Sequence, residues 1–244
     1  MSAPVPVPVF ENQRTRIKIC GLTREADVHA AVSAGVDAIG FVLYAASPRA
    51  VTPDRAAELA RMLPPFVTPV LLFVNHCAAD AVAALAMVPG AWAQFHGDET
   101  PAHCLEVARG SLRPFIRAAR IEDNPQEAGF DLLEYARDYS KAHALLLDAH
   151  VAGYGGGGKV FNWSLLPPNV NAHLVLSGGL TAANVGDGMA QLRPRCRTLT
   201  LDVSSGVEAD APGGGTLKGI KDPEKIHQFV AAARAADHQL AGKH

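Results

Sequence analysis

The sequence predicts an α/β protein, a single (βα)₈ TIM barrel with parallel strands. The chain has 244 residues, and barrels of roughly 250 residues are common as one domain. Short apolar runs recur along it, and such runs are typical of a parallel sheet that helices cover on both faces. Alanine-rich segments with helical spacing separate the runs, and eight strand–helix units fit the length.

An open, doubly wound sheet is the competing fold. Such a sheet usually has fewer strands and often carries a G-x-G-x-x-G turn after its first strand. The first turn here reads Cys20-Gly21-Leu22-Thr23 and lacks that motif. The barrel is therefore favoured.

The predicted strands follow one another along the chain. They cover residues 16–20, 38–43, 69–75, 92–96, 113–118, 144–149, 173–179 and 198–206. Thr23 is a suitable N-cap for the first helix, and Gly35 stands where that helix needs a C-cap. The second helix covers 53–63 and opens with a proline, which suits a first helical turn.

One domain is predicted, with a tail at each end. Residues 1–15 alternate valine with proline and form an extended tail, residues 16–236 form the barrel, and residues 237–244 form a C-terminal tail. The first residues lack the basic and apolar regions of a signal peptide. The longest apolar stretch, 81–93, is too short for a membrane span and is broken by Pro89-Gly90.

The net charge and the cysteine content limit the kinds of binding partner and the cellular compartment that we expect. The chain has 22 Lys and Arg and 24 Asp and Glu, a formal net charge of −2, which gives no support for nucleic acid or an anionic membrane as partner. Four cysteines match neither a zinc motif nor a CxxC pair. We expect reduced thiols, a cytoplasmic protein and a small-molecule ligand, with a monomer and a homodimer both open.

Chemistry in this fold sits at the carboxyl ends of the strands. The residues predicted there are Cys20, Ser47-Pro48-Arg49, Asn75, His96, Arg117 or Arg120, Asp148, Gly178-Gly179, and Asp202 followed by Ser204-Ser205-Gly206. The loops after the seventh and eighth strands of a barrel often bind phosphate through backbone N–H groups. The glycines and serines of these two loops fit that role, although tight turns alone would also explain them.

The other rim residues have alternative interpretations from sequence alone. Cys20 is a candidate for chemistry or a small buried hydrophobe. Asp148 ends an apolar run, where a carboxylate needs a partner, and Asp202 raises the same question, with backbone hydrogen bonds as the favoured answer. Arg49 is a candidate clamp for a carboxylate or a surface arginine. His96 has no neighbours at metal-ligand spacing and is interpreted as a rim histidine.

Taken together, these strand ends resemble the phosphoribosylanthranilate isomerase family of tryptophan biosynthesis. The resemblance covers residues 16 to about 231. The matching segments are Lys18-Ile-Cys-Gly-Leu-Thr23, Gly40-Phe41, Ser47-Pro-Arg49, Phe73-Val-Asn75, Gln94-Phe-His-Gly-Asp-Glu99, Leu147-Asp-Ala149, Gly178-Gly-Leu180, Asp202-Val-Ser-Ser-Gly-Val-Glu208 and Lys221-Asp-Pro223. Any one of them is weak, and their order along a barrel-sized chain is specific.

The resemblance implies an Amadori rearrangement of N-(5-phospho-β-D-ribosyl)anthranilate to 1-(2-carboxyphenylamino)-1-deoxy-D-ribulose 5-phosphate, without cofactor or metal. It implies Cys20 as general base, Asp148 as general acid and Arg49 as the ligand of the anthranilate carboxylate. It also implies phosphate binding by the loops after the seventh and eighth strands. We further expect His96 and Asp202 to contact the substrate.

The chain departs from the family pattern at several places. Phe95 replaces a usual leucine, and Asn162 replaces the usual aspartate before Trp163. The glycine-rich segment 155–158 is expected to act as a mobile lid, and the stretch 212–219 is expanded at the edge of the phosphate site.

Two other hypotheses remain from the sequence. A dual-substrate isomerase of histidine and tryptophan synthesis would use the same barrel, but those relatives tend to have an aspartate where this chain has Cys20. A phosphate-ligand binding protein without catalysis is disfavoured because Cys20, Asp148 and Arg49 are all retained.

Overall fold

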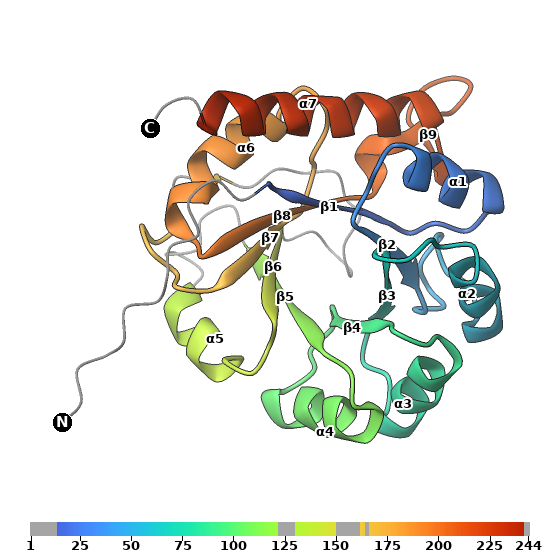
Figure 1. Cartoon of the computed structure of the whole chain (residues 1–244). Helices are drawn as coiled ribbons and strands as arrows, with labels where there is room; N and C mark the ends of the chain where they lie inside the picture. Colours follow the sequence, from blue (N-terminus) through green and yellow to red (C-terminus); the bar gives the residue numbers. More distant parts are fainter. Residues whose placement is uncertain (1–13, 122–129, 150–161, 164–165, 242–244) are drawn as a thin grey trace.

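The computed structural model describes residues 14–121, 130–149, 162–163 and 166–241. Strands β1 to β8 form a closed barrel in sequence order, and each strand pairs in parallel with its neighbours. Helices lie around the outside of the strands (Figure 1). The predicted (βα)₈ barrel is confirmed. The segment expected to act as a lid, 155–158, lies outside the described residues.

The strands begin close to the predicted positions. They are β1 (Arg16–Cys20), β2 (Ala38–Val42), β3 (Thr68–Phe73), β4 (Trp92–Phe95), β5 (Phe115–Ile121), β6 (Ala144–Ala149), β7 (His173–Leu176) and β8 (Thr198–Val203). The glycine and serine turns that the prediction attached to the last two strands lie beyond the strand ends, in the loops at the rim.

The described helices alternate with the strands. They are α1 (Glu25–Ser33), α2 (Pro53–Ala60), α3 (Ala78–Met87), α4 (Pro101–Ser111), α5 (Leu132–Asp138), α6 (Val185–Leu192) and α7 (Pro223–Ala241). Thr52 and Thr100 cap α2 and α4, and a proline follows each of them at the start of the helix. Local sequence signals thus set these helix starts.

The first helix begins one residue later than predicted. Arg24 is the N-cap of α1, so the prediction that Thr23 caps this helix is wrong. The Thr23 hydroxyl instead donates to the carbonyl of Gly219 at 2.8 Å, because a distant loop offers the hydroxyl a partner. Gly35 has a φ of 79° just after the C-cap residue Ala34, which is the left-handed position that favours glycine.

Side chains alternate across each strand because the strand period is two. Ile17 and Ile19 of β1 pack in the large cluster between the strands and the helices. Cys20 packs in a separate cluster with Val42 and Leu72, on the other face of the strands. In a barrel this second face is the interior.

The C-terminal helix is longer than the predicted domain boundary implies. α7 runs to Ala241, so the predicted barrel end at residue 236 falls inside this helix. The Asp237 carboxylate accepts hydrogen bonds from the Thr15 backbone N–H and hydroxyl, at 3.0 Å and 2.7 Å, and it pairs with Arg193. These contacts make residue 237 part of the barrel and attach α7 to the start of β1.

A small hairpin follows the barrel strands. Strands β9 (Glu208–Asp210) and β10 (Thr216–Lys221) pair antiparallel outside the barrel. The hairpin contains the expanded stretch 212–219. Through the bond between Thr23 and Gly219, it is tied to the loop that follows Cys20.

Candidate active site

Charged and reactive side chains gather at the carboxyl ends of the barrel strands. Cys20 is the last residue of β1, and Asp148 is the last but one of β6. Arg49 and His96 follow β2 and β4, and Asp202 lies near the end of β8. All five are at least nine-tenths buried. The structure therefore brings these predicted residues to the same end of the barrel.

The first cluster lies between β1 and β8. The Lys18 ammonium group donates to the Asp202 carboxylate at 2.8 Å, and the Ser177 hydroxyl donates to the other Asp202 oxygen at 3.4 Å. These bonds are to side chains, whereas the sequence favoured backbone bonds for Asp202. The Lys18 charge also acts on the nearby Cys20 thiol. A thiol, an ammonium group and a carboxylate thus lie together at this end of β1 and β8.

Some features of this cluster favour the thiolate form of Cys20, and others oppose it. Burial raises the pKa of Cys20 above its ordinary value, while the Lys18 charge lowers it, the Asp202 charge raises it and Lys221 lowers it. Burial alone lowers the pKa of Lys18. The Asp202 charge and then Cys20 raise it by more than burial lowers it, so the net shift is upward. Lys18 therefore keeps its proton.

Gly40 makes the room in which these groups meet. A Cβ atom at this position would lie 2.7 Å from the Cys20 Sγ and 2.9 Å from the Lys18 Nζ. Contacts that short do not occur for real Cβ atoms. A side chain at position 40 would displace the thiol and the ammonium group, so glycine is required there by space.

The second cluster surrounds Asp148. His96 Nε2 lies 3.0 Å from an Asp148 carboxylate oxygen, and the Gln94 side-chain Nε2 lies 3.2 Å from His96 Nδ1. The Gln94 amide nitrogen is a donor, so Nδ1 accepts and Nε2 carries the hydrogen that points at Asp148. His96 therefore donates a hydrogen bond to one Asp148 oxygen.

Arg49 is held by a buried carboxylate. Its Nε and Nη2 groups donate to the two Glu208 oxygens at 2.6 Å and 2.8 Å, which is the two-pronged pairing that suits a guanidinium group. Glu208 also accepts from the Gly219 backbone N–H at 2.8 Å. Burial raises the pKa of Glu208, but its bond to Arg49 and the charge of Lys221 outweigh this and lower it.

Lys221 joins the same network from the hairpin strand β10. Its ammonium group donates to the Ser204 carbonyl at 2.9 Å and lies 3.4 Å from a Glu208 oxygen. Burial lowers the pKa of Lys221 to about 8, against the opposing effect of Glu208. Lys221 thus connects the loop after β8 to the carboxylate that holds Arg49.

The loops after β7 and β8 have the backbone shapes that glycine allows. Gly178 and Gly179 have φ values of 78° and 62°. A Cβ at Gly206 would lie 1.9 Å from the Leu180 carbonyl oxygen, so the two loops pack directly against each other. Ser205 begins a short 3₁₀ helix, Ser205–Val207. The predicted phosphate loops are therefore adjacent in space.

Other predicted rim residues have structural contacts. The Arg117 guanidinium donates to the Glu99 carboxylate at 3.1 Å and to the Gly97 carbonyl at 3.0 Å, and it stacks on Tyr139. Arg120 pairs with Asp98. These contacts link β5 to the loop after β4, so they stabilise the rim.

Sequence reasoning assigned no role to Lys18, Gln94, Glu208 or Lys221. The signal for the first two was the period of two along the strand, because Lys18 shares a face with Cys20 and Gln94 shares one with His96. Glu208 and Lys221 lie on the hairpin, whose position depends on long-range contacts, so no local pattern identifies them.

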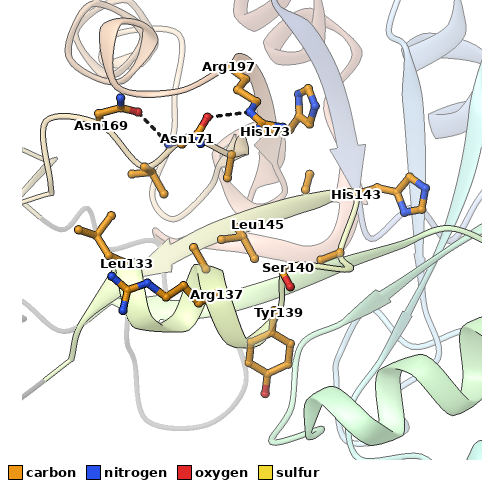
Figure 2. Close-up of a pocket in the computed structure, with 15 residues that line it drawn as sticks. Leu133, Arg137, Tyr139, Ser140, His143, Leu145, Asn169, Asn171, His173 and Arg197 are labelled. Atoms are coloured by element: carbon orange, nitrogen blue, oxygen red, sulfur yellow. Dashed lines mark hydrogen bonds between the residues drawn. The ribbon is translucent and has the colours of Figure 1, made fainter. Parts of the chain in front are cut away.

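A pocket of about 430 Å³ lies elsewhere, between α5 and the segment that leads into β7. Figure 2 shows Arg137 on one side of it and Asn171, His173 and Arg197 on the other. The residues that begin β6 and β7 line it, so it lies at the amino ends of the strands and is separate from the residues described above.

The described residues contain neither a metal-binding cluster nor a membrane-spanning helix. No group of three or more His, Cys, Asp or Glu side chains there is placed to hold a metal ion. In the same part of the chain, no helix combines the length and apolar character that crossing a membrane requires.

Comparison with known proteins decides the family. Residues 17–232 match the family described as N-(5'-phosphoribosyl)anthranilate (PRA) isomerase. The isomerase of Methylibium petroleiphilum is 58% identical over 228 residues, which cover 93% of this chain and 98% of the relative. The isomerase of Leptothrix cholodnii is 55% identical over 94% of this chain and 95% of its own length. The chain belongs to the phosphoribosylanthranilate isomerase family.

Solved structures of phosphoribosylanthranilate isomerases agree with this membership. The Thermotoga maritima enzyme matches with a TM-score of 0.75 and 35% identity, over 91% of this chain and 99% of that one. An isomerase in complex with reduced 1-(o-carboxyphenylamino)-1-deoxyribulose 5-phosphate matches with a TM-score of 0.73, 32% identity and the same coverage. The predicted activity, an isomerase of tryptophan biosynthesis, is confirmed at the level of the family.

Proposed function

We propose that this chain catalyses the isomerisation of N-(5-phospho-β-D-ribosyl)anthranilate with Cys20 as general base and Asp148 as general acid. One observation carries the proposal. A buried thiol beside an ammonium group and a buried carboxylate beside an imidazole lie at the same end of a closed barrel. An acid and a base held in different surroundings are what this rearrangement needs.

Asp148 acts in the first step. Its carboxyl proton passes to the ribose ring oxygen, the bond between that oxygen and C1′ breaks, and the nitrogen lone pair forms the C=N bond of a Schiff base. The Nε2–H group of His96, 3.0 Å from Asp148, then stabilises the carboxylate that this step creates. A donor aimed at a developing charge lowers the barrier.

Cys20 acts in the second step. Its thiolate takes the proton from C2′, the C–H electron pair forms the C1′=C2′ bond, and the C=N electrons return to nitrogen to give an enolamine. The enolamine becomes the ketone when C1′ gains a proton and the 2′-hydroxyl loses one. One proton given by Asp148 and one taken by Cys20 balance, so no net proton is consumed.

Arg49 receives the carboxylate of the anthranilate ring in this proposal. Two of its nitrogens bond Glu208, whereas its Nη1 makes no hydrogen bond among the described residues. Glu208 fixes the guanidinium plane, so that the remaining donors have one direction. Arginine in a fixed plane suits a carboxylate partner.

The phosphate is bound by Gly178, Gly179, Ser204, Ser205 and Gly206 in this proposal. The two loops pack against each other at Gly206, and left-handed glycines leave backbone N–H groups accessible to an anion. We place His96 and Asp202 at the border of the substrate site, where each also holds a neighbouring group, Asp148 and Lys18 respectively.

We propose a cytoplasmic enzyme that works as a monomer or a homodimer, without a nucleic-acid or membrane partner. All four cysteines are free thiols, which suits a reducing compartment. One related structure is of monomers generated from the dimeric isomerase of Thermotoga maritima. Light scattering across a concentration series distinguishes the two states.

A fluorescence assay tests the proposed reaction. The substrate is generated in situ, the protein is added, and the anthranilate signal is followed against a Cys20→Ala control. Rapid consumption by the wild type alone supports the proposal. Folded wild type that leaves the substrate unchanged contradicts it, and a parallel test with the aminoimidazole carboxamide ribotide substrate checks the dual-substrate alternative.

A further inference from the structure

Lys18 is a buried cation that the proposed reaction leaves without a task. Its side chain is 2% exposed, and it lies in β1 between the apolar residues Ile17 and Ile19. A buried ammonium group is costly unless it is paired. An aliphatic side chain fills the same interior position of a barrel at a lower free-energy cost. The buried charge of Lys18 therefore indicates a specific role.

The position of the ammonium group supplies that reason. A hypothetical Cβ on Gly40 would lie 2.9 Å from the Lys18 Nζ and 2.7 Å from the Cys20 Sγ, so both atoms converge on one point above Gly40. Asp202 holds the other side of the ammonium group at 2.8 Å. The cation therefore lies within the roughly 4–6 Å over which an opposite charge favours an ionised group.

We propose that Lys18 is the cation that stabilises the Cys20 thiolate, and that Asp202 positions Lys18 for this task. The inference rests on the proposed role of Cys20 as the base. Lys18 itself transfers no proton. It stays protonated while the thiolate takes the proton from C2′, so its contribution is electrostatic.

Other charged groups also face the thiol. Asp202 on β8 disfavours the thiolate, and Lys221 on β10 favours it less strongly than Lys18 does. The Arg49 side chain packs against Gly21, the residue that follows the thiol. Lys18 is distinguished from these groups by its ammonium group, which meets the thiol above Gly40, and by its position on the same face of β1 as Cys20.

A direct titration of the thiol tests the inference without any substrate. The thiolate absorbs in the far ultraviolet, and subtraction of a Cys20→Ser titration removes the signal of the other cysteines and the tyrosines. We expect Lys18→Met to raise the pKa of Cys20 by about one unit or more, whereas Lys18→Arg keeps a cation and restores most of the lowering. Lys141→Met, at an exposed lysine, is the matched control and leaves the titration unchanged.

A second design covers a folding defect. Lys18→Met leaves Asp202 buried without its partner, and breaking a buried ion pair in this way destabilises a fold. The double variant Lys18→Met/Asp202→Asn removes both charges and relieves that cost. We expect the Cys20 pKa to remain above that of the wild type in the double variant, because the loss of Lys18 outweighs the loss of Asp202.

The outcomes separate this inference from the proposed function. An unchanged Cys20 pKa in folded Lys18→Met and in the double variant overturns the role of Lys18, whatever the activity assay shows. A shift caused by Lys221→Met and not by Lys18→Met does the same. A raised pKa in Lys18→Met supports the inference, and an accompanying fall in turnover then depends on the separate assignment of Cys20 as base.

Discussion

The two reactive groups at the barrel rim, Cys20 and Asp148, have different neighbours. On the β1 and β8 side, Cys20 lies beside an ammonium group that a carboxylate holds in place. On the β4 and β6 side, Asp148 lies beside an imidazole that a glutamine amide orients. One side supplies a lysine ammonium group, and the other supplies an imidazole hydrogen bond.

The difference matches the task proposed for each side. A base of the thiol type must carry negative charge in a buried place, and a cation offsets part of that cost. An acid must be able to hold its proton, and a permanent cation beside it would favour its ionised form at all times. The His96 imidazole instead offers a hydrogen bond to the carboxylate that forms when Asp148 gives up its proton.

The largest expected effect is the loss of either reactive group. Cys20→Ala and Asp148→Asn should each lower kcat about a thousandfold, because general acid and base steps contribute roughly 10² to 10⁴ in rate. Steady-state turnover measures the loss, and circular dichroism checks the fold. Cys104→Ala removes another buried thiol, in α4, and should keep wild-type turnover. Near-normal kcat in either site variant would remove that residue from its role.

A smaller effect is expected at His96, which sharpens the contrast between the two sides. His96→Ala should lower kcat by roughly tenfold to a hundredfold, since a hydrogen bond to a charged group is worth about 1.5–3 kcal/mol. His96→Gln places an amide donor near the lost Nε2 position and should recover part of the rate. His143→Ala, beside the pocket of Figure 2, is the control. Equal rates for His96→Ala and wild type would argue that Asp148 needs no donor.

Glu208 should affect binding more than chemistry. Glu208→Gln weakens the two bonds that fix Arg49, so KM should rise about tenfold, the equivalent of about 1.4 kcal/mol, with kcat changed by less. Glu99→Gln alters another buried carboxylate, the one bonded to Arg117, and should lower Tm without raising KM. A substrate analogue without the anthranilate carboxylate should show no difference between wild type and Glu208→Gln. A difference that persists with this analogue would contradict action through Arg49.

The smallest expected effect is the dependence of stability on pH. Folding raises the pKa of Cys20, so above about pH 8.5 the unfolded thiol has lost a proton that the folded thiol keeps. Stability therefore falls as pH rises there, with a limit of about 1.4 kcal/mol per pH unit from this group. Cys20→Ala should lack this part of the fall. Denaturant titrations of both proteins between pH 7 and pH 10 measure it, and parallel curves would show that the thiol pKa is not raised.

Local pattern was sufficient for the elements and for the position of the predicted site residues. Each barrel strand begins within two residues of the predicted start. Short, nearly continuous apolar runs are typical of strands that are buried on both faces, so they locate the strands well. Thr23 shows the limit of such reasoning. It is a good N-cap by type, yet its hydroxyl bonds Gly219, almost two hundred residues away.

The partners of the site residues were beyond the reach of local pattern. The sequence singled out Arg49 but gave it no protein partner, and only the packing of the β9–β10 hairpin against the rim brings Glu208 to it. His96, which follows β4, and Asp148, on β6, are likewise brought together only by the fold. Contacts between residues far apart in the sequence depend on the closed topology of the barrel, and local patterns in a single sequence do not show which residues will meet.

The sequence by itself determined the barrel, the order of its strands and the carboxyl-end residues that we propose carry the chemistry, because periodicity and strand-end position are local properties. Only the tertiary structure decided the electrostatic surroundings of those residues. Lys18 and Asp202 meet because β1 pairs with β8 when the barrel closes. The charge environment of the thiol is therefore a property of closure, in which the first and last strands of one sheet become neighbours.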